Sequence, residues 1–154
     1  MKKYIYQSLA LALLCVSMLV ITSCKDDDDK PSKPTVTLKE VGHANNKTAM
    51  RGNDMHLEAA IKADGLIKRI DIEIHQEGGS NYKIMKAFTE GKYIGVKNAD
   101  FHEHIDIPAE APLGAYHLHF TVTDQSGQTV MAEEHITVVE NNGTGHDEEE
   151  HHHE

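Results

Sequence analysis

The sequence is short of cysteine and of aromatic residues. Among its 154 residues are two cysteines, five tyrosines, three phenylalanines and no tryptophan. Cys15 lies in an N-terminal signal segment and Cys24 is expected to carry lipid, so the mature chain would hold no free thiol. This excludes a disulfide framework and a thiolate metal site. The few aromatics disfavour a glycan-binding surface, which usually stacks sugars on exposed rings.

Positive charge and catalytic motifs are also scarce. The chain has 15 lysine and arginine residues against 25 acidic ones, a formal net charge of −10, and loss of Lys2 and Lys3 with the signal makes it −12. The negative net charge argues against nucleic acid as a partner and favours cations. There is no nucleophile elbow, glycine-rich phosphate loop or thiol, and an open strand face offers no water-excluding pocket. The sequence therefore does not point to an enzyme.

The one long apolar run predicts a signal peptide over residues 1–23. Two lysines precede the apolar segment Leu9–Ile21, which is too short to span a bilayer comfortably. The segment Ile21-Thr22-Ser23-Cys24 resembles a bacterial lipobox, which implies lipidation of Cys24 and stable membrane anchoring. The alternative is an ordinary secretory signal in which Cys24 is incidental.

Residues 24–33 predict an acidic tether. Lys25–Lys30 resembles the export signal that sends lipoproteins of Bacteroidetes-type bacteria to the cell surface. This implies an outer-membrane lipoprotein on the cell surface or, alternatively, one that faces the periplasm. A plain solvated tether and a cloned epitope or protease site are the other interpretations. Pro31–Pro34 would act as a stiff spacer.

Residues 141–154 predict a disordered tail that is both acidic and rich in histidine. The run from His146 to Glu154 has no apolar residue to bury. Its composition is typical of tracts that bind metal loosely. A solubilising tail and a purification tag are the alternatives.

Residues 34–140 predict a single all-β domain, an immunoglobulin-like antiparallel β-sandwich of about seven strands. Short alternating segments recur with turn signals between them, and no helical period competes. A break is expected at Lys97–Asp100, and the preceding segment from Thr89 has no clear pattern. The expected strands cover residues 35–41, 54–62, 66–75, 82–88, 101–107, 114–123 and 129–139.

The alternation also assigns a face to each side chain, because residues i and i+2 of a strand point the same way. Glu103 and Glu134 fall on inward phases, which the sequence explains only as a strand end or a bulge. The residues expected to point inward are Met55, Leu57, Ala59, Ile61, Ile70, Ile72, Ile74, Tyr116, Leu118, Phe120, Val122, Val130, Ala132, Ile136 and Val138.

The last hairpin has a register that can be predicted from its turn. Asp124-Gln125-Ser126-Gly127 suits a three-residue loop with Gly127 in the left-handed conformation, which pairs Asp124 with Gln128. In this register, the numbers of any two directly opposed residues add up to 252. This register joins apolar inward residues throughout, and on the outer face it sets His117 opposite His135 and His119 opposite Glu133.

The outward positions predict metal sites on both faces of the sandwich. The chain has twelve histidines, including two His-x-His pairs on expected strands. Three or four imidazoles and a carboxylate near one point suit zinc, and copper equally fits these donors. A polar outer face that merely uses histidine is the alternative. The first expected ligand set is His117, His119, His135, Glu133 and His75, with Glu73, Asp71 and Met131 nearby, and the second is His56, His102 and His104, with Glu58 and Asp106 nearby.

Three segments carry a resemblance to known domains. Gly114–Gly127 resembles the last hairpin of bacterial immunoglobulin-like domains, with Tyr116 at the position of their corner tyrosine. Together with Gly65–His75 and Phe101–Pro108, it resembles a family of such lipoproteins described only as a domain of unknown function. The resemblance implies a fold and an envelope location, but no activity.

These observations favour an envelope lipoprotein that binds a divalent transition metal, zinc or copper, through surface histidines. Such a protein would take part in metal acquisition or handling, with an outer-membrane receptor as a possible recipient of the ion. The alternative is a structural, adhesive or protein-interaction module without metal.

Overall fold

The computed structural model describes residues 30–78 and 81–141. The expected signal peptide, Cys24 and the acidic run up to Asp29 lie outside these described residues, as does the tail from residue 142. Within the described part of the chain, no helix is long and apolar enough to cross a membrane.

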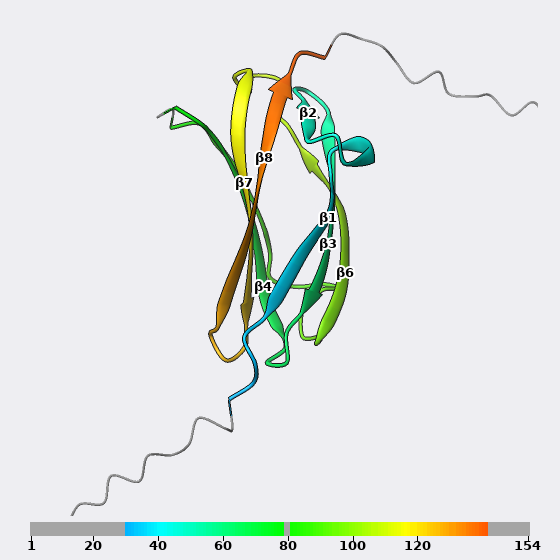
Figure 1. Ribbon diagram of the computed structural model, residues 1–154, viewed down its shortest axis with the longest axis vertical. Coiled ribbons are helices and arrows are strands. Elements are labelled where there is room, and N and C mark those ends of the chain that lie inside the picture. The colour runs from blue at the N-terminus through cyan, green and yellow to red at the C-terminus, as the bar shows by residue number, and fades with distance from the viewer. Residues whose placement is uncertain (1–29, 79–80, 142–154) are drawn as a thin grey trace, which may run out of the picture.

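The domain is an all-β sandwich of two sheets that face each other (Figure 1). One sheet has three strands in the order β1-β3-β6, and the other has five in the order β2-β8-β7-β4-β5. The strands are β1 (Thr35–Val41), β2 (Thr48–Met50), β3 (Asp54–Lys62), β4 (Ile67–Gln76), β5 (Lys83–Phe88), β6 (Asn98–Asp106), β7 (Gly114–Asp124) and β8 (Thr129–Val139), with a short 3₁₀ turn η2 (His43–Asn45).

Strand β2 was not predicted, and it departs from the expected antiparallel pattern because it pairs with β8 in parallel. After β1, the chain leaves the three-stranded sheet through a kink around η2 and joins the other sheet. Gly42 allows the kink, with a φ of +73° and so little space that a Cβ would lie 2.7 Å from the carbonyl oxygen of Thr48. A three-residue strand is too short to show a period in the sequence.

Strand β6 begins at Asn98, so the break predicted at Lys97–Asp100 was wrong. The first residues of β6 pair with the end of β3, where Asn98 lies opposite Lys62. The long partner strand therefore extends the ladder past residues with weak β propensity. The connection falls earlier, over residues 89–97.

The predicted inward faces form the core. Met55, Ile72, Phe120 and the other inward residues of β3, β4 and β7 are fully buried. The hydroxyl of buried Tyr116 donates to the carbonyl oxygen of Pro112 at 2.7 Å, four residues upstream, as a corner tyrosine does.

Val130 and Ala132 of β8 are only partly buried. The reason is that β2 pairs only with Thr137–Val139, so the first part of β8 is a sheet edge.

The two inward-phase glutamates lie on sheet edges and have cationic partners. Glu134 of β8 contacts Lys47 at 2.6 Å, and Glu103 of β6 contacts Lys92 at 3.2 Å. Neither strand end nor bulge is needed to explain them. An inward charge on an edge strand also discourages pairing with another chain.

The β7–β8 turn has the predicted geometry. Gly127 has a φ of +86°, and the amide of Asp124 donates to the carbonyl of Gln128 at 2.9 Å. The buried carboxylate of Asp124 accepts hydrogen bonds from the Ser126 hydroxyl at 2.7 Å and the Gln128 amide at 2.8 Å. Burial alone would raise the pKa of Asp124, but these hydrogen bonds lower it below its usual value.

The expected spacer Pro31–Pro34 contacts this same end of the domain. The side-chain amide of Gln128 donates to the carbonyl of Pro31 at 2.7 Å, and the Ser32 hydroxyl donates to Asp64. The described chain thus enters at the end of the sandwich that carries the β7–β8 turn and leaves at the opposite end (Figure 1).

Candidate metal centre

The outer face of the five-stranded sheet gathers four imidazoles, as predicted. The β4, β7 and β8 ladders align His75 with His117 and His117 with His135. In the next outward row, His119 lies between Glu73 and Glu133. The ring centroids of His117 and His135 are 4.4 Å apart. We call Glu73, His75, Glu77, His117, His119, Glu133 and His135 the five-stranded cluster.

Carboxylates are interleaved with these imidazoles. Glu133 Oε1 lies 2.8 Å from His117 Nδ1, and Glu77 Oε1 lies 2.9 Å from His135 Nδ1. Zinc–ligand bonds of 2.0–2.1 Å put the ligands of a tetrahedral ion roughly 3.3 Å apart. The two observed pairs are hydrogen bonds, and they lie somewhat closer together than the ligands of such an ion.

Three overlapping groups in this cluster have ligand atoms within 4.8 Å of one another. Each group combines imidazole with carboxylate. They are Glu73–His75–His119, Glu77–His117–His135 and His117–His119–Glu133.

Most of these imidazoles are sheltered by their neighbours. The side chains of His117 and His119 are 28% and 25% exposed, whereas that of His135 is 66% exposed. The Nδ1 atom of His75 is buried and has no hydrogen-bond partner among the described residues. The Glu73 Oε1 atom lies 3.5 Å from it, so this nitrogen has an ionic neighbour but no hydrogen bond.

The electrostatics keep one central carboxylate ionised. The hydrogen bond with His117 lowers the pKa of Glu133 against the opposing effect of desolvation, and the charges of nearby imidazoles lower it further. An ionised carboxylate is the form that binds a cation.

Two details of this face differ from the prediction. Asp71 is not part of the cluster, because it lies opposite Thr121 and forms an ion pair with Arg69 at 2.6 Å. Glu77 was missed because it follows β4, although it continues the alternation of Glu73 and His75. Met131 lies opposite Thr121 as predicted and is 53% exposed.

A second group lies on the outer face of the three-stranded sheet, on the other side of the sandwich. There β3 pairs with β6, and the structure sets the register that the sequence left open, with His56 opposite His104 and Glu58 opposite His102. The ring centroids of His56 and His102 are 4.7 Å apart. We call His56, His102, His104, Glu58 and Glu40 the three-stranded cluster.

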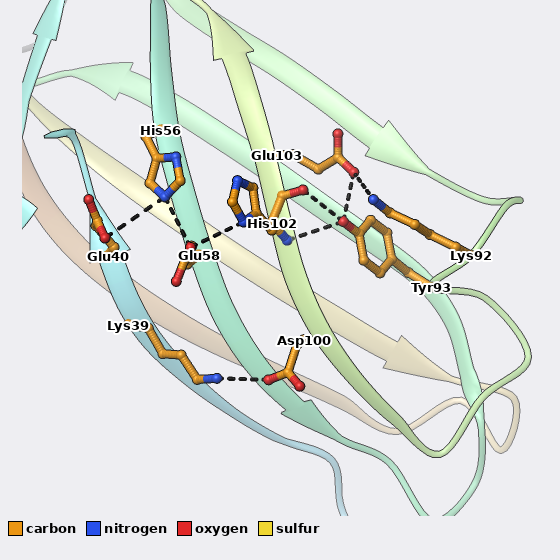
Figure 2. A network of polar contacts seen from close by, with 9 residues as sticks. All are labelled: Lys39, Glu40, His56, Glu58, Lys92, Tyr93, Asp100, His102 and Glu103. Carbon is orange, nitrogen blue, oxygen red and sulfur yellow. Dashed lines mark hydrogen bonds and ion pairs between the residues drawn. The ribbon is translucent and has the colours of Figure 1, made fainter. Parts of the chain in front are cut away.

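Glu58 links two of these imidazoles. Its Oε1 atom lies 3.2 Å from His56 Nε2 and 3.1 Å from His102 Nδ1 (Figure 2). The Nε2 atom of His56 is buried and forms no hydrogen bond of acceptable geometry with a described residue. Glu40 of β1, which the sequence reasoning missed, adds a carboxylate 3.9 Å from that nitrogen.

Asp106 was expected near this second site but lies outside it, opposite Asp54. Asp54 instead approaches His104, at 3.2 Å from Nδ1. The imidazoles of β6 are well exposed, at 59% for His102 and 52% for His104.

Tyr93 supports the strand that carries this second pair of histidines. Its hydroxyl accepts a hydrogen bond from the His102 amide at 3.1 Å and lies 2.8 Å from the His102 carbonyl oxygen and 2.7 Å from a Glu103 carboxylate oxygen (Figure 2). It thereby occupies backbone groups of an edge strand that would otherwise face solvent. No pattern in the sequence predicts this role.

A family model described as a domain of unknown function, DUF4625, matches residues 22–139. The chain belongs to the DUF4625 family. The DUF4625 match spans every described strand and both clusters. Comparison with curated proteins finds no match. The family description carries no activity or ligand.

Proposed function

We propose that this DUF4625 domain binds divalent transition metal ions, zinc or copper, with the five-stranded cluster as the tighter site. One observation carries the proposal: four imidazoles and three carboxylates of adjacent strands meet on one face, in groups whose ligand atoms lie within 4.8 Å. Imidazole and carboxylate are the donors that zinc and copper(II) accept when no thiolate is present.

Two further features support metal over a polar surface. Buried nitrogens of His75 and His56, one in each cluster, form no hydrogen bond within the described residues, and the nearest glutamate oxygens lie at 3.5 and 3.2 Å. Buried polar groups of folded proteins normally form hydrogen bonds, so neither nitrogen has a fully satisfactory partner. A cation bound at each cluster would supply it.

The proposal includes an envelope location. The lipobox-like segment before Cys24 would anchor the protein in the outer membrane, and the acidic run after it would direct it to the cell surface. There the domain would take up or hold metal for acquisition or handling, and the His-rich tail would raise the local ion concentration. An outer-membrane receptor is the proposed recipient.

Calorimetric titration of zinc tests this function. The chain from residue 25 onward, with and without residues 142–154, should show a tight phase that does not depend on the tail. Replacing His117, His119 and His135 by alanine should remove that phase. The matched control replaces His56, His102 and His104 and should leave it in place. Absence of saturable binding to the unmodified domain would refute the function.

A protein-interaction module is the second candidate, and one observation favours it. Met85 and Met131 are 54% and 53% exposed on the two sides of the five-stranded cluster. Exposed methionine is common at adaptable binding surfaces. This candidate predicts that replacing both methionines by glutamine abolishes partner capture without changing zinc affinity.

A further inference from the structure

The ring of His117 lies between two carboxylates and presents a different nitrogen to each. Its Nδ1 lies 2.8 Å from Glu133 Oε1, and its Nε2 lies 3.4 Å from Glu77 Oε1. Glu133 belongs to β8, whereas Glu77 directly follows β4, so the two carboxylates reach the ring from opposite flanking strands. The two nitrogens of His117 therefore face different carboxylates.

Each carboxylate has a second imidazole as a neighbour. Glu77 also lies 2.9 Å from His135 Nδ1. Glu133 Oε2 lies 3.6 Å from His119 Nε2, closer than the 3.9 Å from Glu133 Oε1 to His135 Nε2. Two ligand groups result, Glu77–His135 and Glu133–His119, and His117 is the one residue that belongs to both.

We propose that this face binds two divalent ions side by side, with the ring of His117 as a bridge between them. The inference rests on the proposed function and specifies the arrangement of its tighter site. One ion takes His117 Nε2, Glu77 and His135, and the other takes His117 Nδ1, Glu133 and His119. His75, whose ring centroid lies 4.8 Å from that of His119, stands beside the second ion.

The bridge requires a defined proton change. A neutral imidazole has one nitrogen with a free lone pair and one N–H group. The first ion binds the lone pair, and the second ion replaces the proton of the N–H group, which leaves to solvent. The resulting imidazolate carries a negative charge between two cations, and Glu77 and Glu133 add one negative charge on each side.

The metal-free alternative is equally definite. A protonated His117 ring could donate one N–H group to each glutamate and would produce the same contacts without an ion. The two cases differ in metal content, in proton release and in magnetic coupling, so experiment separates them.

The test uses copper(II) as the probe, with the mature chain from residue 25. Alanine replaces His56, His102 and His104, and serine replaces the four tail histidines, so that only the five-stranded cluster is measured. Bound copper should saturate at two ions per chain. Their electron paramagnetic resonance signal should fall well below that of two isolated ions, because an imidazolate couples the spins. Calorimetry in buffers of different ionisation enthalpy should show an extra proton released with the second ion.

Two variants complete the test. His117→Ala should abolish both the coupling and the extra proton, and His119→Ala should leave one uncoupled ion at Glu77 and His135. The bridge would be overturned if the unmodified face bound only one uncoupled ion. It would also be overturned if the face bound two ions whose spectra did not change in His117→Ala. The proposed function would stand in both cases. No copper bound at this face would overturn both.

Discussion

The two outer faces of this sandwich each carry a His-x-His pair, but they hold it in different structural settings. His117 and His119 lie on β7, which has β4 on one side and β8 on the other. His102 and His104 lie on β6, the edge of the three-stranded sheet. The β7 side chains are about half as exposed, at 28% and 25% against 59% and 52%.

The comparison teaches that the position of a strand in its sheet decides what a short motif can do. A central strand receives ligands from both neighbours and is held by two ladders of hydrogen bonds. An edge strand receives them from one neighbour, and its other side depends on the Tyr93 hydroxyl. Because metal sites need ligands held within fractions of an ångström, the five-stranded cluster should bind more tightly.

The largest expected difference between the faces is in their response to pH. Metal ligation requires neutral imidazole, so protons compete with the ion at every imidazole ligand, and zinc affinity falls more steeply with pH where one ion binds more imidazoles. The three-stranded cluster groups three imidazoles around one point, and each ion site proposed on the other face uses two. For the first ion bound at each face, we expect the larger loss of zinc affinity on acidification at the three-stranded cluster, measured by zinc titration of variants that keep a single face. Equal losses on the two faces would contradict the proposed ligand sets.

Single alanine substitutions should also have different effects on zinc affinity at the two faces. We expect His117→Ala to weaken zinc binding at its face by at least about 100-fold, the upper end of what a supporting residue contributes to metal affinity. His102→Ala should cost about tenfold at the other face, because its ring is exposed and less constrained. His43→Ala is the matched control, since His43 lies in η2 outside both clusters. Isothermal calorimetry measures all three, and a larger effect of His102→Ala would reverse the proposed ranking.

The third prediction concerns Asp124, which anchors the turn of the five-stranded face. Asp124→Ala leaves the partly buried amide of Gln128 without its acceptor and should lower the free energy of unfolding by about 1–3 kcal/mol. Asp124→Asn keeps an acceptor oxygen and should cost less. Urea denaturation at pH 7 measures both.

The pH dependence of this effect has a definite sign. The pKa of Asp124 is lowered in the folded protein, so its stabilisation is fully present above the usual aspartate pKa, near 4, and is lost as the pH falls through the lowered value. The difference between the native protein and Asp124→Asn should therefore shrink below pH 4. A difference that grows in acid would mean that the carboxylate is not stabilising.

The smallest effect is expected at Tyr93, the matching anchor of the three-stranded face. Tyr93→Phe keeps the ring that lies 4.8 Å from that of Phe101 but removes the hydroxyl from the edge of β6. Unfolding should become easier by about 0.5–1.5 kcal/mol, the usual net value of one hydrogen bond. Zinc affinity should fall slightly at the three-stranded cluster and stay constant at the other. A change confined to the five-stranded cluster would show that the two faces are not independent.

Local patterns predicted most of the strands and all of the ligand-bearing face of the last hairpin. Alternation placed Tyr116, Leu118 and Phe120 inward, and the Asp124–Gly127 turn set the pairing of His117 with His135. Both inferences depend on contacts between residues close in sequence. Strand β2 and the start of β6 were missed because they become strands by pairing with β8 and β3, which are distant in the sequence.

The chain itself therefore determined that imidazoles line the outside of a β-sandwich, since a period of two and one tight turn are local properties. The tertiary structure added side chains that no local pattern predicted. Glu77, Glu40 and Tyr93 reach the clusters from the end of β4, from β1 and from the connection before β6. The order of strands in a sheet is set by packing over the whole core, and that order brings these side chains to the histidines.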